Sequence, residues 1–304
     1  MNTEESKPSV GIVGVGNMGG AIALRLLEQG WPVRVRDLVD AKERALEAAG
    51  AVACASAAEL AGASEALLVC VVDADQTREV LFGAGGAIEG LRTGQTVLLC
   101  PTIAPQDVAD CAARLAVRGV PVIDAPMSGG PVRARDGTMS LMIACADEAF
   151  ERQRALLQAI SGRLFRVGTR PGDGARTKLV NNLAAGINLA GAAEVLALAK
   201  RLGLDAATTL DVIEQSSGQS WIGSDRMRRA IAGDYAPRAH TTLLAKDTRL
   251  ALEAARAAGF EPALGRVASE LFRRAVDAGL ADEDDASLFK LLQMTGDAPP
   301  AGLK

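Results

Sequence analysis

The chain has 304 residues with a formal net charge of −4, and 49% of them are hydrophobic against 23% charged. This balance is typical of a globular protein, and the length allows two domains with separate cores. The charge excludes the basic surface of a nucleic-acid binder, no apolar run reaches the length of a membrane span, and the first eight residues lack the apolar segment of a signal peptide, so we expect a cytoplasmic protein without nucleic-acid or membrane partners.

The first predicted strand, Val10–Val13, leads into a glycine-rich turn and then an amphipathic helix. Gly14, Gly16 and Gly19 have the G-x-G-x-x-G spacing of a dinucleotide-binding βαβ unit. The first glycine permits the tight turn, the second lets the backbone approach a pyrophosphate, and the third lets the helix pack closely on the strand. The phosphates would bind the free N–H groups at the positive end of the helix. An ordinary glycine-rich turn is the alternative.

Asp37 follows the second predicted strand, Val33–Val35, eighteen residues after the last glycine of the turn. An acid at this distance accepts hydrogen bonds from the adenosine ribose hydroxyls of NAD. Arg34 and Arg36 lie beside this acid and could attract the 2′-phosphate of NADP. However, Asp37 would repel that phosphate, and strand alternation should point both arginines to the face opposite Val35. We therefore expect NAD rather than NADP.

Strands and helices continue to alternate up to about residue 168, which predicts a doubly wound parallel sheet of the Rossmann type. The two clearest helices in this part are Ala41–Ala49 and Pro105–Val117. The remaining predicted strands are short apolar runs at Ala66–Val72, Thr96–Leu99, Val120–Ile123, Leu141–Cys145 and Arg163–Val167.

From Gly172 onward the pattern is helical, because leucine and alanine recur at helical spacing. The Pro-Gly-Asp-Gly junction at 171–174 separates an NAD-binding domain, 1–170, from an all-helical substrate and oligomerisation domain, 171–304. A long helix of about 40 Å, at 1.5 Å per residue, should join them. The predicted helices are Lys178–Leu202, Ala206–Gln215, Leu244–Ala258, Ala263–Ala278 and Ser287–Leu292.

The cysteines and the single histidine predict no metal site. No two cysteines form a C-x-x-C pair, so we expect reduced core thiols rather than metal ligands or a disulfide framework. His240 cannot build a histidine site alone, and we expect a structural or solvent-facing role for it. The five cysteines are Cys54, Cys70, Cys100, Cys111 and Cys145.

Three further motifs carry chemistry. Asp124 to Gly130 directly follows a strand and contains Ser128-Gly129-Gly130, whose hydroxyl and unobstructed amides suit a small carboxylate, although a plain turn is equally possible. Lys178 and Asn182, four residues apart on one face of the long helix, form a proton donor with a hydrogen-bonding neighbour, or else a solvated lysine. Lys246-Asp247 is a charge pair inside an apolar helix, and a simple surface pair is the alternative.

Together these motifs resemble the β-hydroxyacid dehydrogenase family, the group of 3-hydroxyisobutyrate dehydrogenase, tartronate semialdehyde reductase and L-threonate dehydrogenase. The resemblance covers roughly Ser9 to Leu292 and implies that Lys178 is the catalytic acid/base. Burial would favour the neutral amine that such a base needs. The resemblance also implies that Ser128, Gly129, Gly130 and Asn182 hold the substrate. Expected cofactor contacts come from Gly14, Val15, Gly16, Asn17, Met18, Gly19, Asp37, Val72, Asp73, Thr102 and Lys246.

Within the family, the segments 216–221, 233–238 and 283–285 look closest to the L-threonate dehydrogenase branch, and a homodimer or homotetramer is implied. Pro131, Arg133 and Arg135 depart from the small residues usual after Gly130, and these arginines could tune the substrate pocket or face water. The substrates of the other two enzymes named above, 3-hydroxyisobutyrate and tartronate semialdehyde, stay open as alternatives. Two further classes also stay open: a phosphogluconate-type decarboxylase, which needs a phosphate-binding arginine set, and a non-catalytic NAD-binding regulator, which would be expected to lack Lys178.

Overall fold

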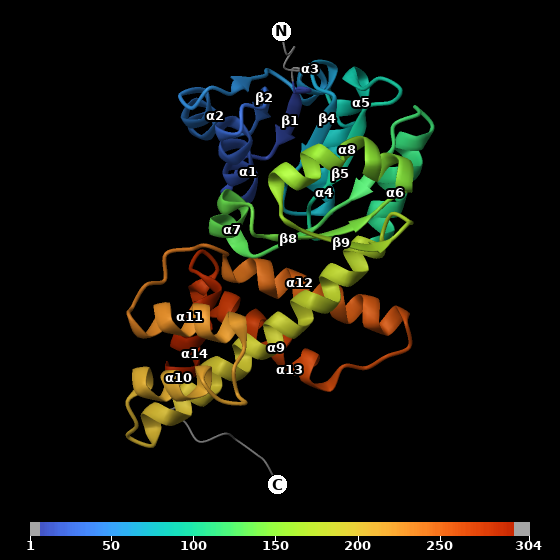
Figure 1. Ribbon diagram of the computed structural model, residues 1–304. Coiled ribbons are helices and arrows are strands. Elements are labelled where there is room, and N and C mark those ends of the chain that lie inside the picture. Colours follow the sequence, from blue (N-terminus) through green and yellow to red (C-terminus); the bar gives the residue numbers. More distant parts are fainter. Residues whose placement is uncertain (1–6, 295–304) are drawn as a thin grey trace. The chain divides into compact units, whose positions relative to one another are not determined.

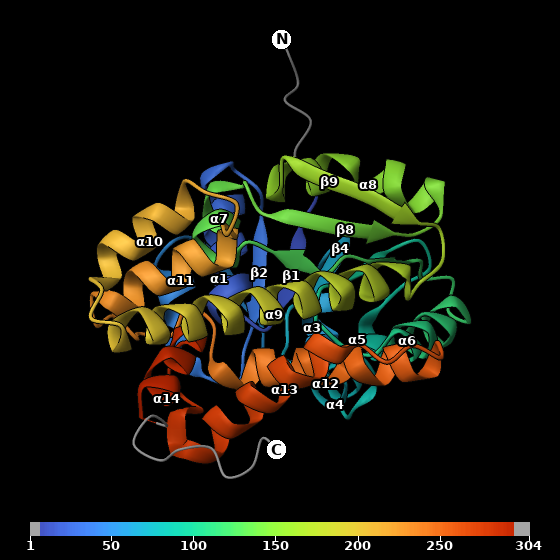
Figure 2. The same cartoon turned by 90° about the horizontal axis from the view of Figure 1, so that it is seen from below.

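The computed structural model describes residues 7–294, and the chain divides after Lys178 into two compact units. Residues 1–6 lie outside the described range, so most of the segment considered for a signal peptide is not described. The division falls inside the long helix α9 (Asp173–Arg201), which is unbroken over 29 residues. At 1.5 Å per residue it is about 43 Å long. It is the long yellow helix in Figure 2.

Within the described residues, the first unit is built on one sheet of nine strands in the order β3-β2-β1-β4-β5-β6-β8-β7, with β9 beside β8 (Figure 1). The pairs from β3 to β6 are all parallel, as predicted, and several predicted strand bounds match within a residue or two. The strands are β1 (Val10–Val13), β2 (Val33–Arg36), β3 (Val52–Ala53), β4 (Ala66–Val69), β5 (Thr96–Leu99), β6 (Val122–Asp124), β7 (Met127–Ser128), β8 (Ser140–Ala144) and β9 (Arg163–Gly168).

Helices cover both faces of this sheet. One core contains apolar side chains of α1, α2, α7 and α8, and the other contains those of α3, α4, α5 and α6. This two-sided covering explains why the parallel strands are continuous apolar runs. The helices are α1 (Asn17–Glu28), α2 (Asp40–Glu47), α3 (Ala57–Gly62), α4 (Ala74–Phe82), α5 (Ala87–Gly90), α6 (Pro105–Ala116), α7 (Gly130–Asp136) and α8 (Asp147–Ile160).

The sheet differs from the prediction at its β8 end. β8 pairs antiparallel with both β6 and β7, and it pairs parallel with β9. A run of apolar residues indicates that a strand is buried, but it carries no information on strand direction. The sequence pattern could therefore not show that β8 is antiparallel to β6 and β7. The two-residue strands β3 and β7 were also not predicted, because they are too short to show an alternating pattern.

The second unit is helical, as predicted, and its core is formed by residues of α9 to α14. Besides these helices, it contains a π-helical turn at Val276–Leu280 and a 3-10 turn at Asp285–Ser287. One helix, α11, was not predicted, since charged residues interrupt its apolar pattern. The bounds are α10 (Ala206–Glu214), α11 (Trp221–Ile231), α12 (Thr241–Ala257), α13 (Ala263–Ala275) and α14 (Leu288–Met294).

α9 corrects the expectation that no apolar segment reaches the length of a membrane span. Among the described residues it is the one helix long and apolar enough, with a mean hydropathy of 1.4 in its best window, 44% of which is buried in the protein. Leu189, Ala193 and Leu196 pack in the helical core. An apolar helix inside a protein core has the same composition as a membrane span, and this one is partly a core helix.

Candidate functional site

The glycine-rich turn joins β1 to α1, and at Gly14 and Gly19 the fold leaves no room for a side chain. Gly14 has φ +87°, and a Cβ there would lie 2.7 Å from the carbonyl oxygen of Cys70. A Cβ at Gly19 would lie 2.0 Å from the carbonyl oxygen of Gly14, so this glycine allows α1 to pack against the turn. A Cβ at Gly16 would meet no atom within 4 Å. Gly16 therefore lies against open space at the start of α1.

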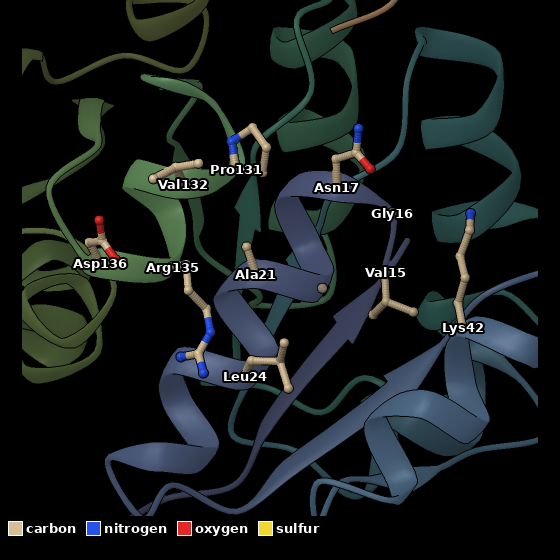
Figure 3. Close-up of a pocket in the computed structure, with 11 residues that line it drawn as sticks. Val15, Gly16, Asn17, Ala21, Leu24, Lys42, Pro131, Val132, Arg135 and Asp136 are labelled. Atoms are coloured by element: carbon tan, nitrogen blue, oxygen red, sulfur yellow. The ribbon is translucent and has the colours of Figure 1, made fainter. Parts of the chain in front are cut away.

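That open space belongs to a cavity of about 540 Å³ (Figure 3). Val15, Gly16 and Asn17 line it at the N-terminus of α1, with Lys42 of α2 on one side and α7 on the other. A helix N-terminus that opens into a cavity presents free N–H groups to an anion. The geometry therefore fits the pyrophosphate of a dinucleotide.

Asp37 lies at the carboxyl end of β2, beside the turn. Its Oδ2 atom accepts a 2.8 Å hydrogen bond from the backbone N–H of Val15, and its Oδ1 accepts one of 3.0 Å from Val39. Val35 is buried in the core that contains α1, whereas Arg34 donates to the carbonyl oxygen of Ala63, after α3, as strand alternation predicts. Arg36 instead pairs with Glu43 on α2, a helix that packs in the same core as Val35. The carboxylate is thus fixed next to the turn that would hold the dinucleotide.

The other expected cofactor residues of this unit follow neighbouring strands. Val72 and Asp73 come after β4, where Asp73 caps α4 by accepting a 2.8 Å hydrogen bond from Gln76 N–H. Thr102 comes after β5. Because β2, β1, β4 and β5 are adjacent and parallel, their carboxyl ends lie at one edge of the sheet. Ligands of doubly wound sheets bind at this edge.

Ser128 ends the short strand β7, and two glycines with positive φ follow it. Gly129 has φ +130° and Gly130 has φ +74°, conformations that an L side chain rarely adopts. Gly130 begins α7, whose Arg135 forms an ion pair with Glu28 on α1. Arg135 is therefore tied to α1. Arg133 packs under Gly129, since its Cδ lies 2.9 Å from the position of a Cβ there.

Asp124, the last residue of β6, is a buried carboxylate whose partners were not predicted. Its Oδ2 accepts hydrogen bonds from the backbone N–H groups of Gly172, at 2.8 Å, and Ala175, at 3.0 Å, so it caps the start of α9. Burial raises the pKa of Asp124 from 3.8 to about 6, although N–H donors from the first turn of α9 lower it. A Cβ at Gly174 would lie 2.8 Å from the Asp124 carboxyl carbon, which explains the glycine there.

α9 carries Lys178 and Asn182 on one face, one helical turn apart, and both are buried, at 7% and 8% exposure. In the helical unit, the side-chain amide of Asn182 donates a 2.6 Å hydrogen bond to Oδ2 of Asp247 on α12. The Lys246 ammonium lies 2.9 Å from the other carboxylate oxygen of Asp247. The Lys246-Asp247 pair is therefore not a surface pair, because Asp247 is buried and fixes the amide of Asn182.

Sequence reasoning did not assign Asp247 to this group, although a signal was present. Leu244, Asp247 and Ala251 follow one another at helical spacing and are all buried, so Asp247 lies on the apolar face of α12. His240 is the N-cap residue of the same helix, and its Nδ1 lies 3.0 Å from the carbonyl oxygen of Asp282. This contact is structural, as expected. All five cysteines are free, and only Cys70 is not fully buried.

Two family models together match most of the chain. Residues 9–168 match the NAD-binding domain of 6-phosphogluconate dehydrogenase, and residues 172–292 match the NAD-binding domain of NADP-dependent 3-hydroxyisobutyrate dehydrogenase. The chain belongs to the 3-hydroxyisobutyrate dehydrogenase family. The second match, over the helical half, favours this family over a phosphogluconate-type decarboxylase.

Relatives agree with this family. L-threonate dehydrogenase of Escherichia coli O6:H1 is 38% identical, over 93% of this chain and 94% of its own length. The crystal structure of 3-hydroxyisobutyrate dehydrogenase from Salmonella typhimurium has a TM-score of 0.89 at 36% identity and covers 94% of this chain and 100% of its own. The structure of Psf3 in complex with NADP+ and 2-OPP has a TM-score of 0.87 at 30% identity and covers 93% of this chain and 99% of its own.

As a member of the 3-hydroxyisobutyrate dehydrogenase family, the protein is an NAD(P)-dependent hydroxyacid dehydrogenase. NAD binding is supported, and NADP stays open, since a relative binds it.

The segments that resemble the L-threonate dehydrogenase branch have structural contacts. Asp284 is fully buried, and its Oδ2 accepts hydrogen bonds from Arg229 on α11, at 3.1 Å, and from the backbone N–H of Arg238, at 2.8 Å. Asp285 accepts a 2.5 Å hydrogen bond from Arg226, also on α11. The segments 233–238 and 283–285 therefore help to hold the helical unit together, whatever else they do.

Proposed function

We propose that the protein oxidises L-threonate, or a similar three- or four-carbon hydroxycarboxylate, with NAD as the hydride acceptor. The observation that carries this proposal is the buried Lys178 one turn from Asn182 on α9, in a chain 38% identical to an L-threonate dehydrogenase. Oxidation of 3-hydroxyisobutyrate and reduction of tartronate semialdehyde are the alternatives within the family.

The coenzyme site would be the carboxyl edge of the sheet. Gly14 to Gly19 would bind the pyrophosphate, Asp37 the adenosine ribose, and Val72, Asp73 and Thr102 the remainder of the dinucleotide. Lys246 would contact it from α12. The open space at Gly16 and the fixed carboxylate of Asp37 support this assignment. The bound nicotinamide supplies the hydride chemistry, whereas the protein supplies position and electrostatics.

The substrate carboxylate would be held by the hydroxyl of Ser128 and by the backbone amides of Gly129 and Gly130. Both residues are glycines in a positive-φ conformation, so no Cβ obstructs their amides, which supports this role. Asn182 would orient the substrate hydroxyl, with its amide held by Asp247.

Lys178 would act as the general acid and base. It takes the proton of the substrate hydroxyl during oxidation and returns it during reduction. Acid–base groups of this kind contribute about 10²–10⁴-fold to the rate. Burial of the lysine supports the proposal, since desolvation favours the neutral amine.

Turnover of a panel of hydroxyacids with NAD tests the substrate class, with L-threonate, 3-hydroxyisobutyrate and L-serine as members. Lys178→Ala should lower kcat by at least about a hundredfold while NAD still binds. Lys178→Arg should not restore it, because a guanidinium does not deprotonate near neutral pH. Lys200→Ala, at an exposed position on the same helix, is the control. A folded Lys178→Ala protein with near wild-type kcat would contradict the acid/base role, whereas wild-type protein that binds NAD but turns over no hydroxyacid would return the regulator class to consideration.

We further propose a homodimer or homotetramer in the cytoplasm. The helical unit exposes large apolar side chains on α9, α10 and α13, among them Leu198 at 53%, Val212 at 61% and Leu264 at 69%. Exposed apolar surface of this kind is typical of subunit contacts. The free, mostly buried cysteines fit a reducing compartment. Light scattering at micromolar concentration tests the assembly, and a clean monomer would contradict it.

A further inference from the structure

The segment from Arg36 to Arg44, which runs from the last residue of β2 into α2, contains three cations and three carboxylates, and each cation lies against a carboxylate. Arg36 pairs with Glu43 at 3.0 Å, Lys42 with Asp37 at 3.5 Å, and Arg44 with Asp40 at 3.9 Å. This segment follows the strand whose end would bind the adenosine ribose. The state of its cations therefore bears on which coenzyme binds.

The Arg36–Glu43 pair is the most enclosed of the three. The Glu43 side chain is only 11% exposed, whereas the Arg44 and Asp40 side chains are 69% and 74% exposed. Oε1 of Glu43 accepts from Arg36 and also from the backbone N–H of Asp37, at 2.7 Å. Arg36 in turn donates a 2.8 Å hydrogen bond to the carbonyl oxygen of Asp37. Glu43 thus holds the guanidinium folded against the backbone of Asp37.

We propose that Glu43 determines coenzyme specificity by withholding Arg36 from the 2′-phosphate of NADP. Arginine is well suited to bind that phosphate, because its planar guanidinium forms paired, charge-assisted hydrogen bonds. Arg36 directly precedes Asp37, the residue proposed to bind the ribose, and its charge is neutralised by Glu43. Discrimination against NADP then has two parts: Asp37 repels the phosphate, and Glu43 neutralises a neighbouring arginine that could attract it. This inference rests on the proposed coenzyme site at Asp37.

Glu43→Gln tests the inference, because the amide oxygen of glutamine can still accept from the N–H of Asp37 while the charge is lost. The readout is the dissociation constants of NADP and NAD, measured by titration of the whole protein without substrate. We expect NADP to bind at least about tenfold more tightly than to wild type, the size of one charge-assisted contact, and NAD to be nearly unchanged. Glu47→Gln, an exposed position on the same helix, should change neither constant.

Arg36→Ala completes the test. It should abolish the gain in the Glu43→Gln background and leave NADP binding unchanged in the wild-type background, where Arg36 is withheld. The effect of Arg36→Ala in the wild-type background can be measured even if Glu43→Gln does not fold. Equal weakening of NADP binding by Arg36→Ala in both backgrounds overturns the inference, as does an unchanged ratio of the two constants in Glu43→Gln. If wild-type protein binds neither coenzyme, the coenzyme site itself is wrong, which is a distinct result.

Discussion

The side-chain amide of Asn182 donates a 2.6 Å hydrogen bond to the buried carboxylate of Asp247, sixty-five residues further along the chain. The same carboxylate lies 2.9 Å from the ammonium of Lys246. One buried acid therefore links the asparagine proposed to orient the substrate to the lysine proposed to contact the coenzyme. Removing the Asp247 carboxylate should therefore shift the side chains of both Asn182 and Lys246, although Asp247 itself is not proposed to contact substrate or coenzyme.

A double-mutant cycle measures this link. Asn182→Ala and Asp247→Ala should each lower kcat/KM for the hydroxyacid. The double variant should cost less than the sum of the two, with a coupling of at least about 0.5 kcal/mol, because the two side chains share one hydrogen bond. Asn182→Ala combined with Glu253→Ala, at an exposed position on the same helix as Asp247, should be additive. Additive losses for Asn182 and Asp247 would mean that they act independently.

The glycines of the β1–α1 turn form a matched pair for separating binding from folding. Gly16 has φ −68°, which alanine can adopt, and a Cβ there would lie in open space. The melting temperature of Gly16→Ala should therefore equal that of the wild type or be slightly higher. The methyl group would occupy space proposed for the pyrophosphate, and NAD affinity should fall. Gly19→Ala would place a Cβ 2.0 Å from the carbonyl oxygen of Gly14 and should destabilise the fold by about 1–3 kcal/mol. Calorimetry with NAD titration distinguishes the two, and a Gly16→Ala protein with full NAD affinity would contradict the site.

Asp124 predicts a pH-dependent contribution to stability. Its pKa in the folded protein, about 6, is raised above 3.8, so the folded state holds this proton more tightly than the unfolded state does. The stability that it contributes is present below pH 4 and is lost as pH rises to 6, by at most about 1.4 kcal/mol per pH unit. Asp124→Asn should remove this slope from the free energy of unfolding measured in urea between pH 4 and 7. Asp110→Asn, at an exposed position, should keep it; an identical slope in both variants would refute the assignment.

The buried arginines of α11 predict a stability difference between neighbours. Arg226→Met leaves Asp285 buried without its 2.5 Å partner, and breaking such a pair costs about 3–5 kcal/mol. Arg228 is 56% exposed and pairs with Asp211 at 3.0 Å. Arg228→Ala should lower the free energy of unfolding by about 1 kcal/mol or less. Thermal unfolding of the two variants provides the comparison. Similar melting temperatures would show that the buried network contributes little.

The sequence predicted best those parts in which burial alone decides the pattern. Val10–Val13 and Thr96–Leu99 are strands with the predicted bounds, because a strand covered on both faces is a continuous apolar run. α11 was not recognised for the opposite reason. Arg226 and Arg229 are polar in sequence but buried in the fold, where Asp285 and Asp284 neutralise them.

The site divides in the same way. The glycine-rich turn and Asp37 are local in sequence, so their spacing could be recognised. The partners of Asp124 and Asn182 lie 48 and 65 residues away, and no spacing rule connects them. Lys246-Asp247 was open to two interpretations, because adjacent charges on a helix are usually solvated. The helical spacing of Leu244, Asp247 and Ala251 favoured a buried Asp247, and the packing of α12 shows that it is buried.

The cap that Asp124 provides for α9 decides how this enzyme can be cut into pieces. A fragment that stops at residue 170 lacks the N–H groups of Gly172 and Ala175, and it would leave a carboxylate that is 1% exposed without those partners. A fragment that continues to residue 178 retains them. In a chimaera that joins this nucleotide-binding half to the helical half of a relative, the first turn of α9 should therefore be inherited from the same parent as Asp124.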